Sequence, residues 1–584
     1  YKELGLLFRE DTVLDSGPIL EEYDFIVVGA SPAGCVVTNR LTERPDWDVL
    51  LLEAGGDGTV YNDVPALTTY YLFTEYNYNY VTEKSDKACL GMVKGRCPWP
   101  SGKGVGGGSL INAMIYTRGN RRDYDDWERS GNPGWSYEDV LPYFKKSEAM
   151  HIDYLRNSPY HGREGEVPIT YAPFKSKFIE KFLQAGQELG LDTVDYNGES
   201  AIGFSPIQST MFRGKRISAS RAFLQPIRER KNFHISQFSK VTKILIDPVT
   251  KLAYGVEFHK KGRRRIVRAK KEVIISSGAF GSPQILMLSG IGPERHLRDV
   301  GINLVQNLDV GDNLQEHISM AGLSFLVNET LTVDIADVVR RLPMKFLQWY
   351  TTGTGELTTV GCEGLGYVKT KYAAPGEYPD IELIMVAVSG FAADAGANLR
   401  KGMGVSDAVY DRVYKPIEGR QGWTIWPMLL YPKSKGTVRL RSKNPHDRPK
   451  ITHNFLEEID DLKVLVEGIR WAINVSNTHT FRQVGSYLHD IPIPGCEGEA
   501  FASQEYWECC VKQITTQLHH QSGTCKMGPA TDPTAVVDPR LRVYGVGNLR
   551  VADASIIPII PGGHTMATAY MIGEKVGDLI KEDW

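Results

Sequence analysis

The hydrophobic and polar positions near the N-terminus follow the pattern of a βαβ unit. Residues 23–41 predict an apolar strand, a glycine-containing turn and a helix, and the apolar run at 47–53 has the length of a second strand. A further apolar run at 273–275 precedes a helical segment, and a strand at 549–553 precedes a closing helix. The pattern therefore predicts one α/β domain assembled from three separated pieces of the chain.

The middle of the chain has a different pattern. Residues 381–386, 423–428 and 437–441 have strand length, and the last of these alternates apolar and polar positions, as in a sheet with one wet face. Apolar residues then recur at helical spacing over 462–473. An antiparallel sheet backed by helices is expected here.

The predicted fold class is α/β, with a Rossmann-like dinucleotide-binding domain interleaved with an α+β domain built on the antiparallel sheet. A chain of 584 residues is long enough for two closely packed domains. We assign residues 20–150, 215–315 and 500–584 to the first domain, and residues 151–214 and 316–499 to the second.

Composition and charge exclude several classes of protein. The chain is 42% hydrophobic and 23% charged, which is typical of a globular enzyme, and its formal net charge is -3. The basic cluster at 260–265 lies between two predicted strands and indicates a solvated hairpin tip, so no nucleic-acid partner is expected. No stretch approaches the roughly 18 consecutive apolar residues of a membrane span.

Two sequence features predict a secreted glycoprotein. Asn328 and Asn474 each begin a glycosylation sequon. The chain has eight cysteines, of which Cys89 and Cys97 bracket a short loop that a disulfide could close. We therefore expect an extracellular location.

The turn after the first strand has the residues that a dinucleotide requires. Gly29 permits the tight bend, and Gly34 permits close packing of the helix on the strand. The free amides at the helix N-terminus suit a pyrophosphate. Ser31 stands where glycine is usual, and it is small enough to cap the helix without abolishing binding. Glu53, at the end of the next strand, is placed to accept a hydrogen bond from a ribose hydroxyl.

Two C-terminal segments supply candidate catalytic residues. His520 begins the run H-Q-S-G-T-C-K-M-G, and His564 lies in G-G-H-T-M-A-T. Histidine suits the removal of a hydroxyl proton as hydride leaves carbon, because its ordinary pKa is near neutrality. A single histidine is more often structural than catalytic, and the pairing with the dinucleotide turn is what favours a redox site.

These motifs, in this order, resemble those of the glucose–methanol–choline (GMC) family of FAD-dependent alcohol oxidases and dehydrogenases. The family's first signature is similar to residues 102–112 and its second to residues 278–292. Trp99-Pro100 and the segment 523–528 look most like the arthropod branch, although Ser101 stands where that branch commonly has arginine. The resemblance extends from residue 23 to residue 580.

The resemblance implies FAD as cofactor, His520 as the base and His564 as a hydrogen-bonding partner of the substrate oxygen. It places the glycine-rich segment beside the isoalloxazine and Val241 at the adenine. Asp553 and Ala554 would contact the phosphate or ribitol, and Thr565 and Met566 would contact the ring. The residues implied to contact FAD are Gly29, Ser31, Gly34, Glu53, Trp99, Val105, Gly108, Ser109, Asn112, Ala113, Val241, Asp553, Ala554, Thr565 and Met566.

The implied reaction is oxidation of a small alcohol to a carbonyl by hydride transfer to FAD, with dioxygen or a quinone as the electron acceptor. The aromatic run at 70–80 favours an aromatic alcohol and could cover the pocket entrance, with His519 and Tyr78 as candidate pocket residues. Glucose dehydrogenase-type sugar oxidation and a non-redox hydroxynitrile lyase on the same scaffold remain alternatives. The cysteine and histidine spacings do not predict a metal site.

Overall fold

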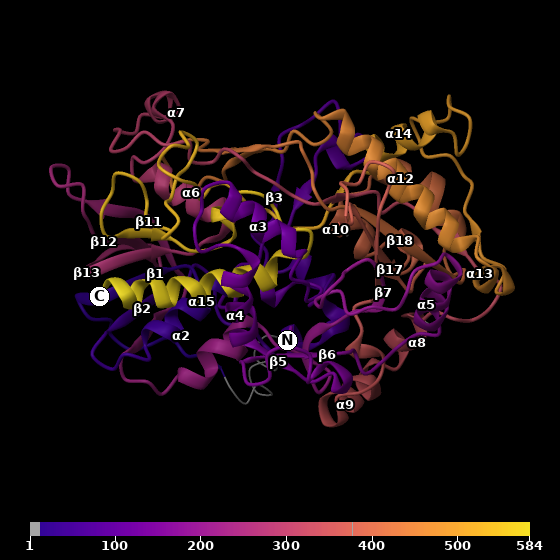
Figure 1. Cartoon of the computed structure of the whole chain (residues 1–584), viewed down its shortest axis with the longest axis horizontal. Coiled ribbons are helices and arrows are strands. Elements are labelled where there is room, and N and C mark those ends of the chain that lie inside the picture. The colour runs from indigo at the N-terminus through magenta and orange to yellow at the C-terminus, as the bar shows by residue number, and fades with distance from the viewer. Residues whose placement is uncertain (1–11, 334, 377) are drawn as a thin grey trace.

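Two β-sheets lie side by side along the long axis of the protein in the computed structural model, which describes residues 12–333, 335–376 and 378–584 (Figure 1). One sheet is mixed and lies beside a helix from near each end of the chain, and the other is antiparallel. The predicted α/β class with a second, antiparallel sheet is confirmed.

The first sheet contains seven strands in the order β10-β2-β1-β13-β12-β11, with β23 beside β13. β1, β2, β10, β23 and the second half of β13 are parallel and almost wholly buried, which is why they form continuous apolar runs. The strands are β1 (Glu22–Val28), β2 (Val49–Leu52), β10 (Phe233–Ser236), β11 (Ser239–Ile246), β12 (Ala253–Lys260), β13 (Arg263–Ile275) and β23 (Leu549–Val551).

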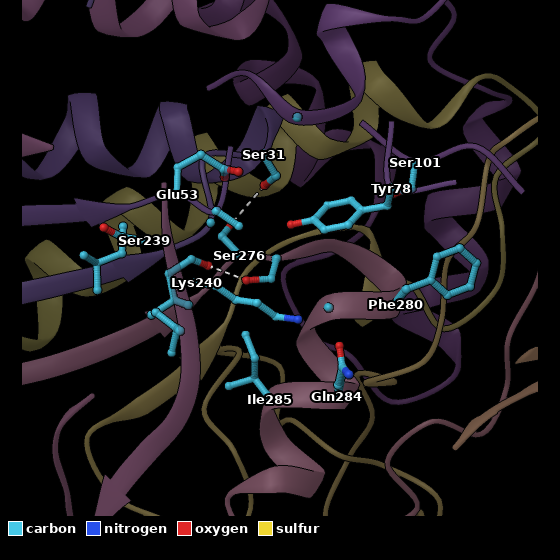
Figure 2. A pocket seen from close by; sticks show the side chains of 18 of the residues that line it. Ser31, Glu53, Tyr78, Ser101, Ser239, Lys240, Ser276, Phe280, Gln284 and Ile285 are labelled. Atoms are coloured by element: carbon cyan, nitrogen blue, oxygen red, sulfur yellow. Dashed lines mark hydrogen bonds between the residues drawn. The ribbon is translucent and has the colours of Figure 1, made fainter. Parts of the chain in front are cut away.

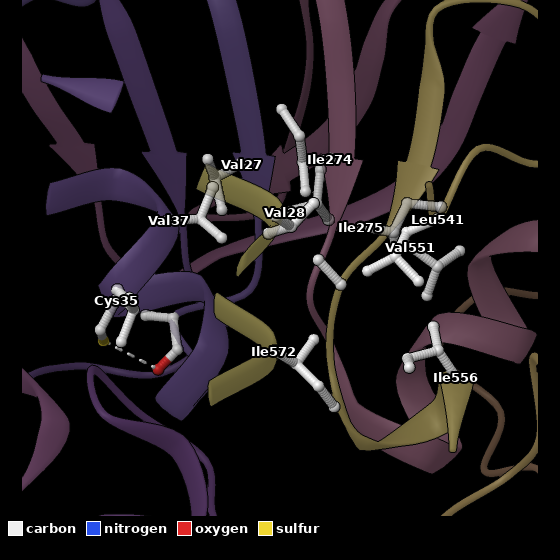
Figure 3. Packing of buried hydrophobic residues seen from close by; sticks show 14 of the residues in the cluster. Val27, Val28, Cys35, Val37, Ile274, Ile275, Leu541, Val551, Ile556 and Ile572 are labelled. Carbon is white, nitrogen blue, oxygen red and sulfur yellow. Dashed lines mark hydrogen bonds between the residues drawn. The ribbon is translucent and has the colours of Figure 1, made fainter. Parts of the chain in front are cut away.

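Helices α2 (Pro32–Leu41) and α15 (Thr565–Asp583) pack together against this sheet. Val28 and Ile275 pair in register on neighbouring strands, and Figure 3 shows Ile572 of α15 facing their ends. Other helices of this half are α3 (Arg121–Arg129), α4 (Tyr137–Ser147), α6 (Gly278–Leu288) and α7 (Glu294–Asp299).

The second sheet has eight antiparallel strands in the order β21-β15-β18-β17-β16-β7, with β14 joining β18 to β22. Helices α12 (Ile459–Ser476) and α5 (Phe178–Glu188) pack against it. The strands are β7 (Gly203–Pro206), β14 (Ile318–Ser319), β15 (Phe325–Leu326), β16 (Cys362–Val368), β17 (Ile381–Val386), β18 (Gly422–Leu429), β21 (Tyr487–Leu488) and β22 (Thr516–Gln517).

The strand predicted at 437–441 does not belong to this sheet. β19 (Thr437–Arg439) instead pairs with β20 (Lys450–Thr452) in a separate two-stranded ribbon. Alternation of apolar and polar residues identifies a half-buried strand but not its partner, so the pattern could not assign the ribbon to a sheet.

The predicted domain boundaries differ from the two hydrophobic cores. Helix α14 (Gln504–Gln513) buries Tyr506 and Trp507 in the core of the second sheet, although residue 500 was taken as the start of the first domain's last piece. Conversely, β6 (Val167–Thr170) packs in the core of the first sheet. Both elements are amphipathic, and their periodicity does not reveal which core they face.

Two disulfides are formed, Cys89–Cys97 and Cys496–Cys509. Cys525 is a free, buried thiol. In the part of the chain that the structure describes, no helix combines the length and the apolar character needed to cross a bilayer.

Candidate active site

The turn between β1 and α2 is built on two glycines that no other residue could replace without displacing backbone. Gly29 has φ +101°, and a Cβ atom there would lie 2.5 Å from the carbonyl oxygen of Ser276. A Cβ on Gly34 would lie 2.2 Å from the carbonyl oxygen of Gly29, so Gly34 brings the helix against the strand. Ser31 caps α2 by accepting from the Gly34 amide at 3.2 Å.

A first cavity opens beside this turn (Figure 2). Gly29, Ser31, Glu53 and Val241 line it, as does Lys240, whose amine points into the cavity in Figure 2. Burial lowers the pKa of Lys240. A lysine in this cavity adds positive charge where a pyrophosphate would bind, and the sequence analysis did not identify it.

Glu53 is buried at the end of β2, and its carboxylate accepts hydrogen bonds from the Ala30 and Gly55 amides at 2.9 and 2.7 Å. Burial raises its pKa. Each oxygen retains acceptor capacity, so the carboxylate is held in place and can still accept from a hydroxyl in the cavity.

Tyr78, a candidate substrate-pocket residue, lines the first cavity and not the second, which contains the histidines. Its ring stacks on Tyr80 with centroids 5.4 Å apart, and Figure 2 shows its hydroxyl directed towards Ser31. Earlier residues of the same aromatic run, Tyr70 and Leu72, line a second cavity. A run of aromatic residues does not show which way each ring points. The sequence therefore could not assign its two ends to different cavities.

The second cavity has a volume of about 590 Å³ and shares Ser31, Gly102 and Gly107 with the first. It therefore continues from the dinucleotide turn towards the second sheet. The predicted residues that line it, besides Ser31, are Gly108, Ser109, Asn112, Ala113, His519, His520, Asp553, Ala554, His564, Thr565 and Met566.

Asp553 acts through the start of α6. Its carboxylate accepts from the Gly278 amide at 2.9 Å, the Ser282 hydroxyl at 2.6 Å and the Ser555 amide at 2.7 Å. Ser277, next to Gly278, lines both cavities. Asp553 thus fixes the backbone where the two cavities meet.

Trp99 and Val105 were predicted to contact the cofactor, but neither lines the first or the second cavity. Trp99 lies behind Phe280 and donates its indole N–H to the Glu316 carboxylate at 2.9 Å. Burial raises the pKa of Glu316 to about 8. Gly34 also lies behind the wall, where it serves packing. Motif matching assigned these residues without showing which side of the wall they occupy.

His520 and His564 meet at the wall of the second cavity. Their ring centroids are 4.5 Å apart in an edge-to-face arrangement, and both residues are buried. His520 follows β22 and donates its backbone N–H to Glu316 at 2.6 Å. His564 directly precedes α15 and donates its backbone N–H to the Thr117 hydroxyl at 2.5 Å.

His317 determines which nitrogen of His520 carries a proton. His317 Nε2 is 3.0 Å from the Leu430 carbonyl oxygen, which can only accept, so this nitrogen is protonated. Burial, followed by the neighbouring His564, lowers the pKa of His317 to about 3, and the ring is neutral with an accepting Nδ1. His520 Nδ1, at 2.9 Å, must donate to it. His520 Nε2 is therefore unprotonated.

Glu382 has the corresponding position behind His564. Its Oε1 atom accepts from His564 Nε2 at 3.0 Å, and the residue is fully buried on β17. Neither His317 nor Glu382 was among the residues predicted for the site. Glu382 could have been noticed in the sequence, because a charged residue within the apolar strand I-E-L-I-M-V is unusual.

Four buried polar atoms on residues that line the second cavity lack a partner within the described residues: Trp426 Nε1, Gln517 Nε2, His519 Nε2 and Gln521 Oε1. Trp426 Nε1 and Gln517 Nε2 are both buried, on β18 and β22, and both residues line the cavity. Trp426 pairs with Ile384, two residues along β17 from Glu382. A buried unpaired donor costs stability unless a ligand or water satisfies it.

Potential metal ligands form a single cluster in the described ranges, Cys89, Cys97 and His453. The two cysteines are joined to each other as a disulfide. The two candidate asparagines for glycosylation, Asn328 and Asn474, are both exposed.

Comparison with known proteins identifies close relatives. Two family models described as GMC oxidoreductase match residues 23–319 and 432–573. "Glucose dehydrogenase [FAD, quinone]" of Drosophila pseudoobscura pseudoobscura is 42% identical over 96% of this chain and 87% of the relative. "Ecdysone oxidase" of Bombyx mori is 33% identical over 100% of this chain and 84% of the relative. The crystal structure of a pyridoxine 4-oxidase superposes with a TM-score of 0.80 at 25% identity, covering 96% and 99% of the two chains.

Proposed function

Because this chain belongs to the GMC oxidoreductase family and is an FAD-dependent enzyme that oxidises CH–OH donors, we propose that its substrate is an alcohol on a largely apolar body. The observation that carries this proposal is the second cavity, where the histidine pair opens onto walls that are mostly apolar. The product is the corresponding carbonyl compound.

The residues present fit FAD. The Gly29–Gly34 turn is closed to any Cβ atom, Glu53 holds an oriented carboxylate, and the two cavities join to give one continuous path. Residues of the first cavity would hold the adenosine and phosphates, and Asn112, Ala113, Thr565 and Met566 would hold the ring. Bound FAD supplies the acceptor for the hydride that leaves the carbinol carbon.

His520 is the base in this proposal. Its Nε2 atom is unprotonated because Nδ1 donates to His317, so Nε2 can take the hydroxyl proton of the substrate. Burial, followed by the neighbouring His564 and His317, lowers the pKa of His520 and keeps the ring neutral. His564, fixed by Glu382, orients the substrate oxygen.

The cavity walls favour an apolar or aromatic substrate. Leu67, Ile115, Val386 and Met403 are among the side chains that line the second cavity. The unpaired donors Trp426 Nε1 and Gln517 Nε2 could each serve one further oxygen acceptor. The expected substrate is therefore an alcohol with an aromatic or alicyclic body and a second oxygen that can accept a hydrogen bond.

Sugar oxidation is the second candidate, because a relative that is 42% identical is named glucose dehydrogenase. Every hydroxyl of a buried sugar needs a hydrogen-bonding partner, and a site built for a sugar offers a polar group to each. The apolar walls of the second cavity argue for the first candidate.

The two candidates are separated by mixing the FAD-loaded protein anaerobically with glucose, benzyl alcohol and a ring-bearing alicyclic alcohol. We expect the ring-bearing alcohols to bleach the flavin absorbance and glucose to leave it unchanged. Bleaching by glucose alone would overturn the proposal. No bleaching, together with cyanide release from a cyanohydrin, would favour the non-redox lyase.

We also propose a quinone or dioxygen as electron acceptor. The printed name of the glucose dehydrogenase relative includes a quinone, which supports the former. Admitting air to the bleached protein, and in a parallel sample a soluble quinone, compares the two rates of colour return.

Secretion is proposed on separate grounds. The disulfides Cys89–Cys97 and Cys496–Cys509, and the exposure of Asn328 and Asn474, support it. Peptide mapping of protein from its native source, before and after enzymatic removal of N-glycans, would detect glycans at the two asparagines. Their absence from both positions would count against this proposal.

A further inference from the structure

Arg216 is a buried cation that has no carboxylate partner among the residues that the structure describes. It lies on the short strand β9 (Lys215–Arg216), and its side chain is fully buried. All the acceptors of its guanidinium are neutral oxygen atoms. They are the backbone carbonyl oxygens of Asn62, Ser109 and Asn112 at 2.8, 3.2 and 2.6 Å, the side-chain amide oxygen of Asn112 at 2.7 Å and the Thr68 hydroxyl at 2.7 Å.

The charge of Arg216 is therefore not compensated by a direct contact. Asp63 acts on it electrostatically, but the Asp63 carboxylate forms its ion pair with Arg221 at 2.6 Å. Arg550, which is also buried, contacts the Glu272 carboxylate at 2.6 Å. Burial lowers the pKa of Arg216 to about 10, so the guanidinium is still charged at neutral pH. A buried charge without a counter-charge costs stability, which indicates that the charge has a use.

Arg216 lies directly behind the wall of the second cavity. It does not line that cavity itself, but Thr68, Ser109 and Asn112, which accept hydrogen bonds from it, all do. The lining residues within the described ranges include no lysine or arginine, so a cationic side chain can act on this cavity only from behind the wall. Asn112 is also one of the residues that would hold the flavin ring.

Arg216 fixes the direction of the Asn112 side chain. A guanidinium can only donate, so the amide oxygen of Asn112 faces it. The amide nitrogen of Asn112 then faces the other way, and it lies 2.9 Å from Met566 Sδ, on a residue that lines the second cavity. The contact thus joins a buried positive charge to a hydrogen-bond donor of the flavin site.

We propose that Arg216 is a positioning residue that holds Asn112 and whose charge stabilises bound FAD in its reduced, negatively charged state. In the proposed function, a hydride passes from the carbinol carbon to FAD and the hydroxyl proton passes to His520, so the cofactor gains one negative charge. That charge would be the counter-charge of Arg216. Coulombic attraction is strong where water is excluded, so the guanidinium can act through the wall without touching the ring. The inference rests on hydride transfer to FAD and not on the identity of the alcohol.

The test is an anaerobic titration of the FAD-loaded protein with dithionite and a reference dye, which gives the reduction potential of the bound flavin. Arg216→Met removes the charge and keeps a long side chain. We expect the equilibrium constant for two-electron reduction to fall about tenfold, which corresponds to a potential about 30 mV lower. Arg216→Lys keeps the charge but loses the planar fork, and it should retain most of the wild-type potential. The matched control is Arg550→Met, which removes a buried arginine that is paired with Glu272 and should leave the potential unchanged.

Sulfite provides a second measurement that needs no electron transfer. Sulfite adds to oxidised flavin and leaves the ring negatively charged, so its affinity reports how well the site stabilises that charge. We expect the wild type to bind sulfite more tightly than free FAD does. The Kd for sulfite should rise about tenfold in Arg216→Met and change little in Arg216→Lys.

Three results would overturn the proposal: a wild-type potential in Arg216→Met, equal falls in Arg216→Met and Arg216→Lys, or a fall of the same size in Arg550→Met. Each would mean that Arg216 only supports the fold. The ratio of flavin to protein absorbance shows whether each variant retains FAD. If Arg216→Met did not, weaker sulfite binding by the wild type than by free FAD would still overturn the proposal. Because no alcohol is present, failure of the alcohol proposal would leave these results intact.

Discussion

The two sides of the histidine pair differ in the charge of the groups behind them. Behind His520 lie a neutral imidazole, His317, and a backbone carbonyl. Behind His564 lies the carboxylate of Glu382. Two rings whose centroids are 4.5 Å apart thus have different neighbours: His520 Nδ1 donates to a neutral ring, whereas His564 Nε2 donates to a carboxylate. The proposed base is His520 because its Nε2 atom is unprotonated, and this difference between the two sides is what the following variants test.

Removing His520, the proposed proton acceptor, should have the largest effect on the rate of flavin reduction. We expect His520→Ala to lower the anaerobic rate of flavin reduction by about 10²- to 10⁴-fold, the range associated with a positioned general base. The ratio of flavin to protein absorbance should stay at the wild-type value, because His520 belongs to the second cavity and the dinucleotide turn to the first. An unchanged reduction rate would remove His520 from the mechanism.

Changing the group behind His520 should have the next largest effect. His317→Phe keeps a ring in the same space but removes the acceptor that holds the His520 proton on Nδ1, so the proton can move to Nε2. We expect kcat to fall about tenfold, and His317→Asn, which retains an acceptor oxygen, to recover part of the loss.

The matched control for this change is His453→Phe, which removes another buried histidine whose ring stacks on Phe455. Loss of rate in His453→Phe as large as in His317→Phe would mean that both effects come from destabilisation. Thermal unfolding of the three variants provides the independent check.

Neutralising the group behind His564 should have a smaller effect. Glu382→Gln replaces a charge-assisted hydrogen bond with a neutral one, and we expect kcat/KM to fall about fivefold. Glu363→Gln, a buried glutamate on β16 of the same sheet, is the control and should behave as the wild type. A fall in Glu382→Gln that equals the fall in His317→Phe would erase the contrast between the two sides.

The pH dependence sharpens the comparison without a substitution. Because the unprotonated His520 is the active form and its pKa lies well below 6.5, kcat/KM should stay level as the pH falls through 6.5 and decline only at lower values. A midpoint of the acid limb at or above 6.5 would show that the site titrates as an ordinary histidine.

The dinucleotide turn could be predicted because its signals are local. Gly29, Gly34 and Glu53 lie within one βαβ unit, and spacing along the chain places them together. His317 and Glu382 could not be found this way. Each contacts its histidine across the second sheet, from strands whose register depends on the whole fold. The positions of Tyr78 and Trp99 could not be predicted for a similar reason. Residue type and position in the sequence do not specify whether a ring faces a cavity or lies behind its wall.

The first sheet also constrains the order in which the protein can mature. β1 pairs with β13, β13 pairs with β23, and α2 rests on α15, so the dinucleotide turn at the start of the chain is supported by elements made last. Arg40 of α2 and Glu574 of α15 form a buried ion pair across this contact. A nascent chain still on the ribosome lacks this support. We therefore expect FAD to load after the chain is complete, and free FAD to protect the completed chain from proteolysis but not a ribosome-held one.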